Sequence, residues 1–254
     1  MPEVAQALIR TLQNEDADVP MVTAIIAKDP GLTTTLMRMA NSAMFGLSRS
    51  VETLDSAVTV IGLAHIRARA LSICMASSVV FPAGLDRLEF WRNSMVCAGY
   101  SKWLASRLGM DEQLAWLTGM MLRLGVVIIA THQPGAASLI EAHPCPPGER
   151  WKRERALVGM DEGQIAALIA RRWDFPNAVV DALECASTPL SNSDSNLGAV
   201  VHLAALLTEQ TSVAVPNLND LPLAVLRGLN VDTEKLQSMV PPAESFSDIS
   251  MLLA

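Results

Sequence analysis

Residues 28–47, with the sequence KDPGLTTTLMRMANSAMFGL, decide the fold class of this chain. Pro30 suits the first turn of a helix, because its fixed φ is already helical and its missing N–H would have no partner there. Gly46 interrupts the pattern that follows. One apolar helical face lies between these two residues: Leu32, Leu36, Met39 and Ala40. The stretch therefore predicts an amphipathic helix that starts at the Asp29–Pro30 step.

The rest of the chain carries the same helical periodicity, and clean alternation of apolar and polar residues never extends beyond a few positions. Thr53 is a favourable N-cap for a short helix that Gly62 ends. We therefore expect an all-α protein. The other expected helices cover about residues 64–80, 86–108, 111–130, 161–173, 177–186, 197–208, 223–229, 233–239 and 246–253.

The segment Phe81-Pro-Ala-Gly84 is the best candidate for a domain boundary, because proline and glycine both interrupt helices. We expect two helical lobes, residues 1–83 and residues 84–254. The net charge of −7 is uneven: residues 1–172 carry 17 Lys/Arg against 16 Asp/Glu, and residues 173–254 carry 2 against 10. The acidic C-terminal helices would repel phosphates, so we expect no nucleic-acid partner.

Half of the 254 residues are apolar and the mean hydropathy is +0.30, which supports a substantial core and excludes intrinsic disorder. The longest apolar run, residues 114–130, contains Arg123, so we expect a buried core helix and no membrane span. The N-terminus does not resemble a secretory signal. Widely spaced cysteines favour reduced thiols in the cytoplasm: Cys74, Cys97, Cys145 and Cys185.

Residues that commonly perform catalysis are sparse. None of the four histidines has a His, Asp or Cys three or four positions later, which is the spacing that places two ligands on one helical face. We expect them to be hydrogen-bonded core or surface residues: His65, His132, His143 and His202. Phosphate-binding glycine motifs and a nucleophile elbow are absent from the sequence. The mixed-sign run at residues 150–155 is expected to be a solvated helix face rather than an anion-binding patch.

Residues 28–47 resemble the signature stretch of the HDOD family, the HD-related output domains of bacterial signalling proteins. The resemblance continues through residues 51–62, 90–92 and 159–176, and covers roughly residues 2–210. It implies an N-terminal helical lobe peculiar to the family and a C-terminal lobe similar to the HD phosphohydrolases. The signature positions, which we expect to be structural, are Asp29, Pro30, Asn41, Ser42 and Gly46.

True HD enzymes bind divalent metal through histidines and an aspartate on several helices, and the resemblance implies where those ligands would stand here. The matching positions hold other residues: Asn93, Leu122, Arg123, Glu162, Ala186 and Ser187. Leucine offers a cation nothing and arginine repels it, so we expect no metal, no cofactor and no catalysis. We call these six positions the remnant pocket.

Arg123 is the most distinctive residue of the remnant pocket, because an arginine in an apolar helix must reach water or a carboxylate. We hypothesise that it places a fixed positive charge where the metal would be, paired with Glu162, Glu154 or Asp181. Three interpretations stay open from the sequence: an ion pair that only locks the lobe, a guanidinium that receives a nucleotide phosphate, and an exposed side chain without a role.

Asn41 and Ser42 are expected to form a C-cap that holds the turn to Gly46. The alternative is a role in partner contact for the loop at residues 43–50, which contains Met44, Phe45 and Arg49.

These observations favour a non-catalytic signal-transduction, output or scaffold module that binds protein partners in a bacterial cytoplasm. One alternative is a nucleotide sensor that uses the remnant pocket. The second alternative is a residual metal-dependent phosphohydrolase or phosphodiesterase. The sequence identifies neither the partner nor the signal.

Overall fold

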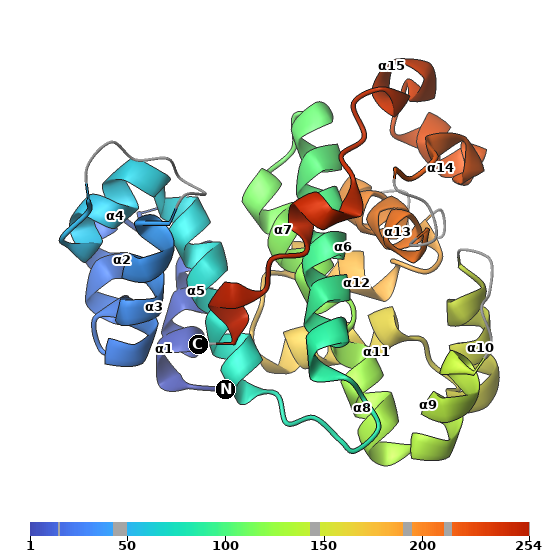
Figure 1. The fold of residues 1–254 in the computed structure, drawn as a ribbon, viewed down its shortest axis with the longest axis horizontal. Helices are drawn as coiled ribbons and strands as arrows, with labels where there is room; N and C mark the ends of the chain where they lie inside the picture. The colour runs from blue at the N-terminus through green and yellow to red at the C-terminus, as the bar shows by residue number, and fades with distance from the viewer. Residues whose placement is uncertain (15, 43–49, 143–147, 190–194, 211–214, 254) are drawn as a thin grey trace. The chain divides into compact units, whose positions relative to one another are not determined.

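The computed structural model describes residues 1–14, 16–42, 50–142, 148–189, 195–210 and 215–253 (Figure 1). Every regular element within these ranges is an α-helix or a short 3₁₀ helix, and no strand is present in them. The expectation of an all-α fold is confirmed. The chain divides into two compact units, and two short segments, Arg172–Pro176 and Ser250–Ala254, belong with the N-terminal one.

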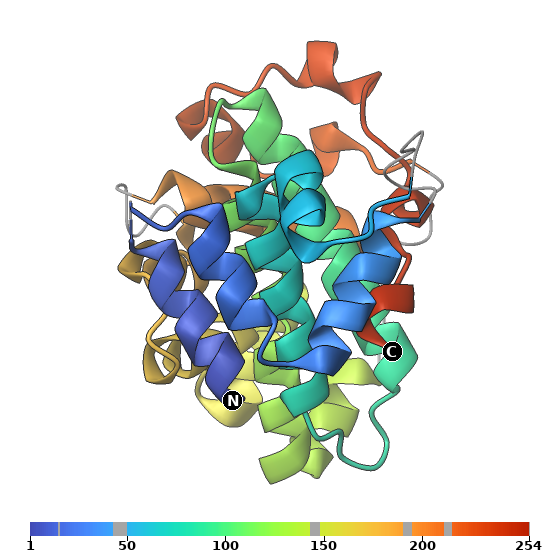
Figure 2. The same cartoon turned by 90° about the vertical axis from the view of Figure 1, so that its left-hand side faces the viewer.

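The first unit contains Met1–Val80 and those two segments. Its helices are α1 (Glu3–Leu12), α2 (Val19–Ile26), α3 (Pro30–Ala40), α4 (Leu54–Ile61) and α5 (Leu63–Ser78), followed near the C-terminus by a 3₁₀ turn at Ser250–Leu252. Helix α5 contacts each of the other four, and Figure 2 shows α1 and α2 side by side. Fully buried side chains fill the space between them: Leu8, Ile9, Ile26, Leu36, Ile66 and Leu71.

Local sequence signals set the helix limits in this unit. The carboxylate of Asp29 accepts a hydrogen bond from the N–H of Leu32 at 3.0 Å, and Thr53 Oγ1 accepts one from the N–H of Ser56 at 3.2 Å. These two N-caps confirm the predicted starts of α3 and α4. Gly62 ends α4 at φ +99°, a conformation that favours glycine, and the chain then bends by 115° into α5.

The second unit contains Phe81–Arg171 and Asn177–Ile249. Its α-helices are α6 (Arg87–Arg107), α7 (Glu112–Met121), α8 (Leu124–His132), α9 (Pro134–Glu141), α10 (Glu149–Val158), α11 (Glu162–Arg172), α12 (Asn177–Glu184), α13 (Asn196–Glu209), α14 (Leu223–Gly228) and α15 (Thr233–Gln237). Helix α6 is buried along most of its length and contacts both α7 and α13. Trp91 and Tyr100 are fully buried on it.

Three sequence expectations are wrong in the part of the chain that follows residue 84. The single helix predicted over residues 111–130 is two helices, α7 and α8, which meet at Leu122 and Arg123. The helix predicted over residues 246–253 is replaced by short 3₁₀ turns, at Ala243–Phe246 and Ser250–Leu252. The run at residues 150–155 is not a fully solvated face, because Arg150 and Glu154 are buried.

The stretch Glu112–His132 is long and apolar enough to pass a length and composition test for a membrane span. Within its most apolar window, 78% of the residues are buried inside the protein. A helix in the core of a protein also passes this length and composition test. The burial of Glu112–His132 agrees with the expectation that it is a core segment.

Candidate functional site

A buried ion-pair cluster lies where α10 meets the start of α11. Arg150 and Glu154 are one turn apart on α10, so both project from the same face. The guanidinium Nε of Arg150 lies 2.9 Å from Glu154 Oε1 and 3.9 Å from Glu162 Oε2. Arg150 is 8% exposed, Glu154 0% and Glu162 2%. We call Arg150, Glu154 and Glu162 the buried cluster; one cation faces two carboxylates there.

Hydrogen bonds hold both carboxylates of the buried cluster. Glu162 Oε1 accepts one from Trp151 Nε1 at 3.1 Å, and Glu154 Oε2 accepts one from the backbone N–H of Glu162 at 2.7 Å. That N–H lies at the first residue of α11, where the helix dipole favours a negative charge. A Cβ on Gly125 of α8 would lie 2.1 Å from the backbone oxygen of Glu162, so only glycine permits this approach of α8 to α11.

His202 packs beside the cluster as a neutral ring. Its centroid is 5.1 Å from that of Trp151, and its Nδ1 lies 2.7 Å from the carbonyl oxygen of Ala186. A carbonyl only accepts, so Nδ1 carries the proton and Nε2 does not. Burial lowers the pKa of His202, which keeps the ring uncharged near neutral pH. His202 is therefore a hydrogen-bonded core histidine, as the sequence predicts.

A second polar group is built around Asp161, which is fully buried. Asp161 Oδ2 accepts hydrogen bonds from Arg155 Nη1 and from Ser187 Oγ, both at 2.7 Å. Its Oδ1 accepts one from the N–H of Gln164 at 3.0 Å, while the Gln164 amide oxygen accepts from the N–H of Asp161 at 3.1 Å. This reciprocal pair is a capping box, so Asp161 fixes the start of α11.

The six remnant-pocket positions are only partly brought together. Glu162 belongs to the buried cluster, Ser187 to the Asp161 group, and the Ala186 carbonyl holds His202. Leu122 is buried, with its Cδ1 3.4 Å from where a Cβ on Gly163 would be. Asn93 is half-buried on α6, and no hydrogen bond joins it to the other five within the described ranges.

Arg123 does not form the expected ion pair with Glu162, Glu154 or Asp181. It lies between α7 and α8, and its Nε is buried with no hydrogen-bond partner in the described part of the chain. Its positive charge still lowers the pKa of Glu154 and of Glu209. Arg123 is therefore close enough to act on these carboxylates through its charge, without direct contact.

Arg150, the residue at the centre of the cluster, could not be picked out from the sequence, because charged runs are typical of solvated helices. The same holds for Glu209, whose Oε2 accepts a hydrogen bond from the N–H of Gly148 at 2.7 Å and whose pKa is raised chiefly by burial. The available signal was Trp151, a large apolar residue beside Arg150 in the charged run. A tryptophan at that position marks a helix face that turns inward.

Burial, together with the negative charge of Glu162, raises the pKa of Glu154 to about 8, although Arg150 opposes the shift. The folded protein then holds a proton that the unfolded chain loses near pH 4.3, at roughly the usual glutamate pKa. The proton on Glu154 therefore contributes to the free energy of unfolding. That contribution is fully present at low pH and is lost as pH rises through about 8.

We expect Glu154→Gln to remove that pH dependence. Urea unfolding of both proteins at pH 6, 7 and 8 measures it, and the difference between them cancels groups that titrate alike, such as Glu209 and His202. The wild type is expected to lose stability relative to the variant as pH rises, by at most about 1.4 kcal/mol per pH unit. A difference that stays constant from pH 6 to 8 would show that Glu154 is ionised throughout.

The residues present do not fit the divalent metal that the resemblance to HD enzymes implies. One oxygen of Glu162 accepts from Trp151 and the other faces the guanidinium of Arg150. Arg123 adds a second positive charge, which lowers the pKa of the neighbouring Glu154. No group of three metal-ligating His, Cys, Asp or Glu side chains is found across the ranges that the structure describes. A cation would meet two arginines and too few donors.

A hydrogen-bonded clamp around Asn41 stands at the C-terminus of α3, in the first unit. The Asn41 Nδ2 donates to the carbonyl oxygens of Met37 at 3.0 Å and Val51 at 2.9 Å. Its Oδ1 accepts from the N–H of Val51 at 2.7 Å and from Ser50 Oγ at 3.2 Å. Asn41 is therefore a C-cap, as expected, and it also joins α3 to the residues after the 43–49 segment.

The signature residue that follows Asn41 is Ser42. Ser42 is half-buried, and its Oγ has no hydrogen-bond partner in the described ranges. Met44, Phe45, Gly46 and Arg49 lie outside the described residues.

We expect Asn41→Ala to destabilise the first unit by about 1–3 kcal/mol, because the Val51 N–H and two carbonyls lose their partner. Ser50→Ala, which removes only one exposed bond of the same clamp, should change stability by less than about 0.5 kcal/mol. Urea unfolding measures both, and amide exchange of Val51 reports the clamp directly. Unchanged Val51 protection in Asn41→Ala would contradict this role.

The profile of the HDOD domain family matches residues 1–189. A solved structure from Geobacter sulfurreducens, described as an HDOD domain protein with unknown function, is 17% identical with a TM-score of 0.76, over 100% of this chain and 86% of that one. A solved structure from Shewanella amazonensis SB2B, named as a candidate phosphohydrolase, is 25% identical with a TM-score of 0.77, over 99% of this chain and 94% of that one.

A third solved structure, named as a candidate signal transduction protein from Marinobacter aquaeolei VT8, is 23% identical with a TM-score of 0.78, over 96% of this chain and 56% of that one. An uncharacterized protein of Treponema pallidum (strain Nichols) is 24% identical over 188 residues, 72% of this chain, and the chain spans about a third of its length, 36%. Since the family profile covers most of the sequence, including both the Asn41 clamp and the buried cluster, this chain belongs to the HDOD domain family.

Proposed function

We propose that this protein is a non-catalytic signal-transduction module that acts by binding another protein. The observation that carries the proposal is the buried cluster, in which Arg150 faces the carboxyl groups of both Glu154 and Glu162. The acid that matches an HD ligand position, Glu162, is already engaged by an indole and a guanidinium. An internal ion pair of this kind stabilises one conformation of the lobe and leaves no open coordination position.

The names of two solved relatives point to two different roles, signalling and phosphohydrolase activity. The Marinobacter protein is named for signal transduction and the Shewanella protein for phosphohydrolase activity. Since the donors of this chain do not fit a divalent cation, the signalling role is the one we adopt for it. The hydrolase remains the rival that the closing experiment addresses.

The loop at residues 43–50 is our proposed contact surface for the partner. Its side chains Met44, Phe45 and Arg49 belong to the types enriched at the centres of protein interfaces. The Asn41 clamp fixes the positions of α3 and Val51, which flank the loop. Binding residues that are flanked by fixed positions reduce the conformational entropy lost on association.

Affinity capture from the native host, followed by titration of the purified partner, tests this function. Three baits are used: the wild type, the triple variant Met44→Ser, Phe45→Ser and Arg49→Ser, and a control with Glu3→Ser, Gln6→Ser and Arg10→Ser on the exposed face of α1. We expect the wild type and the control to bind the same partner, and the loop variant to bind it at least about tenfold more weakly.

Equal binding of the partner by all three baits would contradict the loop as the contact surface. Saturable binding of a cyclic dinucleotide by the wild type, lost in Arg123→Ala, would instead support the nucleotide-sensor alternative. Stability of each bait is checked first by urea unfolding, so that a misfolded variant is not mistaken for a non-binding one.

A further inference from the structure

A pocket of about 350 Å³ lies in the second unit, and its lining includes Arg150 of the buried cluster but neither Glu154 nor Glu162. It is formed by α8, α9 and residues 83–85, with Arg150 of α10 at one end. Most of its lining is aliphatic, including Leu85, Val126, Ile129 and Ile140, and no aromatic side chain lines it. The volume is at the lower end of the range for ligand pockets, and the walls suit an aliphatic chain rather than a stacked base.

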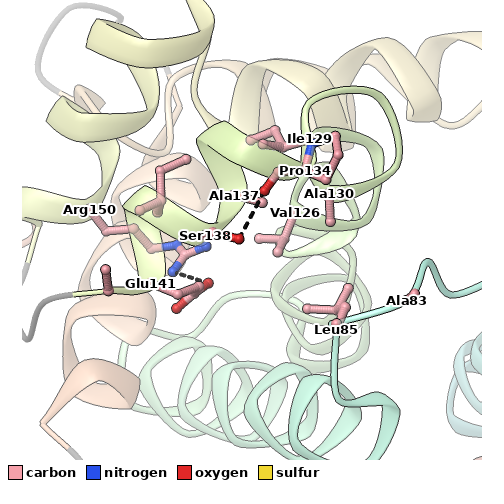
Figure 3. A pocket seen from close by; sticks show the side chains of 13 residues that line it. Ala83, Leu85, Val126, Ile129, Ala130, Pro134, Ala137, Ser138, Glu141 and Arg150 are labelled. Atoms are coloured by element: carbon pink, nitrogen blue, oxygen red, sulfur yellow. Dashed lines mark hydrogen bonds and ion pairs between the residues drawn. The ribbon is translucent and has the colours of Figure 1, made fainter.

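One end of the pocket is polar. Arg150 Nη1 donates to Glu141 Oε1 at 2.7 Å, and Figure 3 shows these two side chains pointing toward each other, with Leu85 and Ala83 at the opposite side. The Arg150 side chain is 9% exposed and that of Glu141 53%. The ion pair uses one nitrogen and one oxygen, so Nη2 of Arg150 and Oε2 of Glu141 make no hydrogen bond with any described residue.

The charges at this end determine which head group fits. An anion would have to displace Glu141 from Arg150, and the same guanidinium already faces Glu154 and Glu162. A cation would be placed beside the buried positive charge of Arg150. A neutral head group that accepts from Nη2 and donates to Oε2 leaves the ion pair intact and brings no new charge out of water. A primary or cyclic amide has its C=O and N–H on the same side and meets both requirements.

We propose that this pocket binds a small neutral amphiphile, a primary or cyclic amide with an aliphatic chain, whose chain lies between α8 and α9 and whose amide contacts the Arg150–Glu141 pair. This site is distinct from the remnant pocket and does not depend on the protein-binding role. Arg150 connects the site to the buried cluster, so a bound amide touches the same side chain that holds Glu154 and Glu162 in place.

Three probes of equal chain length test the head group: hexanamide, hexanoate and hexylamine. Small fragments bind weakly, so saturation-transfer NMR on the full chain is the suitable measurement. We expect hexanamide to bind at least about tenfold more tightly than either charged probe. Equal binding of all three, or none by hexanamide, would overturn the proposal.

Filling the pocket tests the location. Ala137→Leu and Ala142→Leu each add a branched side chain to the pocket lining. Ala136→Leu is the control, because Ala136 lies next to Ala137 on α9 but does not line the pocket. We expect at least about a tenfold loss of hexanamide binding in the two lining variants and none in the control. Two filling variants are used so that a folding defect in one leaves the other as the test, and retained binding in both would place the site elsewhere.

Glu141→Gln tests the chemistry. The variant keeps a hydrogen-bonding side chain but leaves the positive charge of Arg150 less compensated at the pocket end, so we expect the preference to change from hexanamide to hexanoate. If hexanamide binds the variant as tightly as the wild type, and hexanoate gains nothing, the Arg150–Glu141 pair does not recognise the head group and the proposal fails.

Discussion

Gly125→Ala is expected to destabilise the protein by about 3 kcal/mol or more, or to prevent folding of the second unit. A Cβ at this position would lie 2.1 Å from the backbone oxygen of Glu162 and 2.6 Å from its Cα. The obstructing atoms are backbone, so no rotamer change relieves the clash. Helix α8 would have to move away from the start of α11, and Glu162 would leave its place between Trp151 and Arg150.

Gly135→Ala is the matched control for this substitution. It lies on α9, and a Cβ there would meet nothing within 4 Å. Since alanine favours the helical state over glycine, we expect it to be neutral or to stabilise by up to about 1 kcal/mol. Urea unfolding and the soluble yield measure both variants. A Gly125→Ala protein within about 1 kcal/mol of the wild type would contradict the close packing of α8 on α11.

Arg150→Met is expected to cost about 3–5 kcal/mol near neutral pH, because it leaves Glu162 buried without the cation that faces it. Methionine preserves most of the aliphatic volume, so the loss reports charge rather than packing. Adding Glu162→Gln to Arg150→Met should recover part of the loss, since the buried acid that has lost its cation is then neutral. Recovery of this kind separates the electrostatic role from a general folding defect.

Lys152→Met is the control for Arg150→Met on the same helix. Lys152 pairs with Glu149 at the surface, and their side chains are 66% and 41% exposed. Exposed pairs contribute between zero and about 1 kcal/mol, so this variant should unfold at nearly the wild-type urea concentration. Equal losses in Arg150→Met and Lys152→Met would mean that the buried cluster has no special role in stability.

The fold class and several helix ends could be predicted because their causes are local. Asp29 and Thr53 each accept a hydrogen bond from an N–H three residues later. The apolar face of α3 is likewise set by residues within that one helix. The break between α7 and α8 could not be predicted, since the residues around Leu122 and Arg123 include no proline and continue an apolar pattern. The approach of α8 to α11 at Gly125 involves residues far apart in the sequence.

In the candidate site too, features with local causes could be predicted, and features that depend on contacts between distant helices could not. The resemblance pointed to Glu162, which does belong to the buried cluster, but its partners come from α10 and could not be read from spacing. The alternating charges of α10 look like a surface pattern, and only tertiary contacts with Glu141 and Glu162 show that Arg150 is turned inward. The ion pair that the sequence led us to expect for Arg123 is not formed, and its Nε is buried with no hydrogen-bond partner in the described ranges.

The most direct test of the central claim is metal loading of the purified protein combined with a turnover assay. The protein is stripped of metal, incubated with Mn²⁺, dialysed and analysed for bound metal, and then assayed with bis(p-nitrophenyl) phosphate. The buried cluster predicts no stoichiometric Mn²⁺ and no hydrolysis above the buffer rate. One tightly bound Mn²⁺ per chain, with turnover that Glu162→Gln abolishes, would contradict the account.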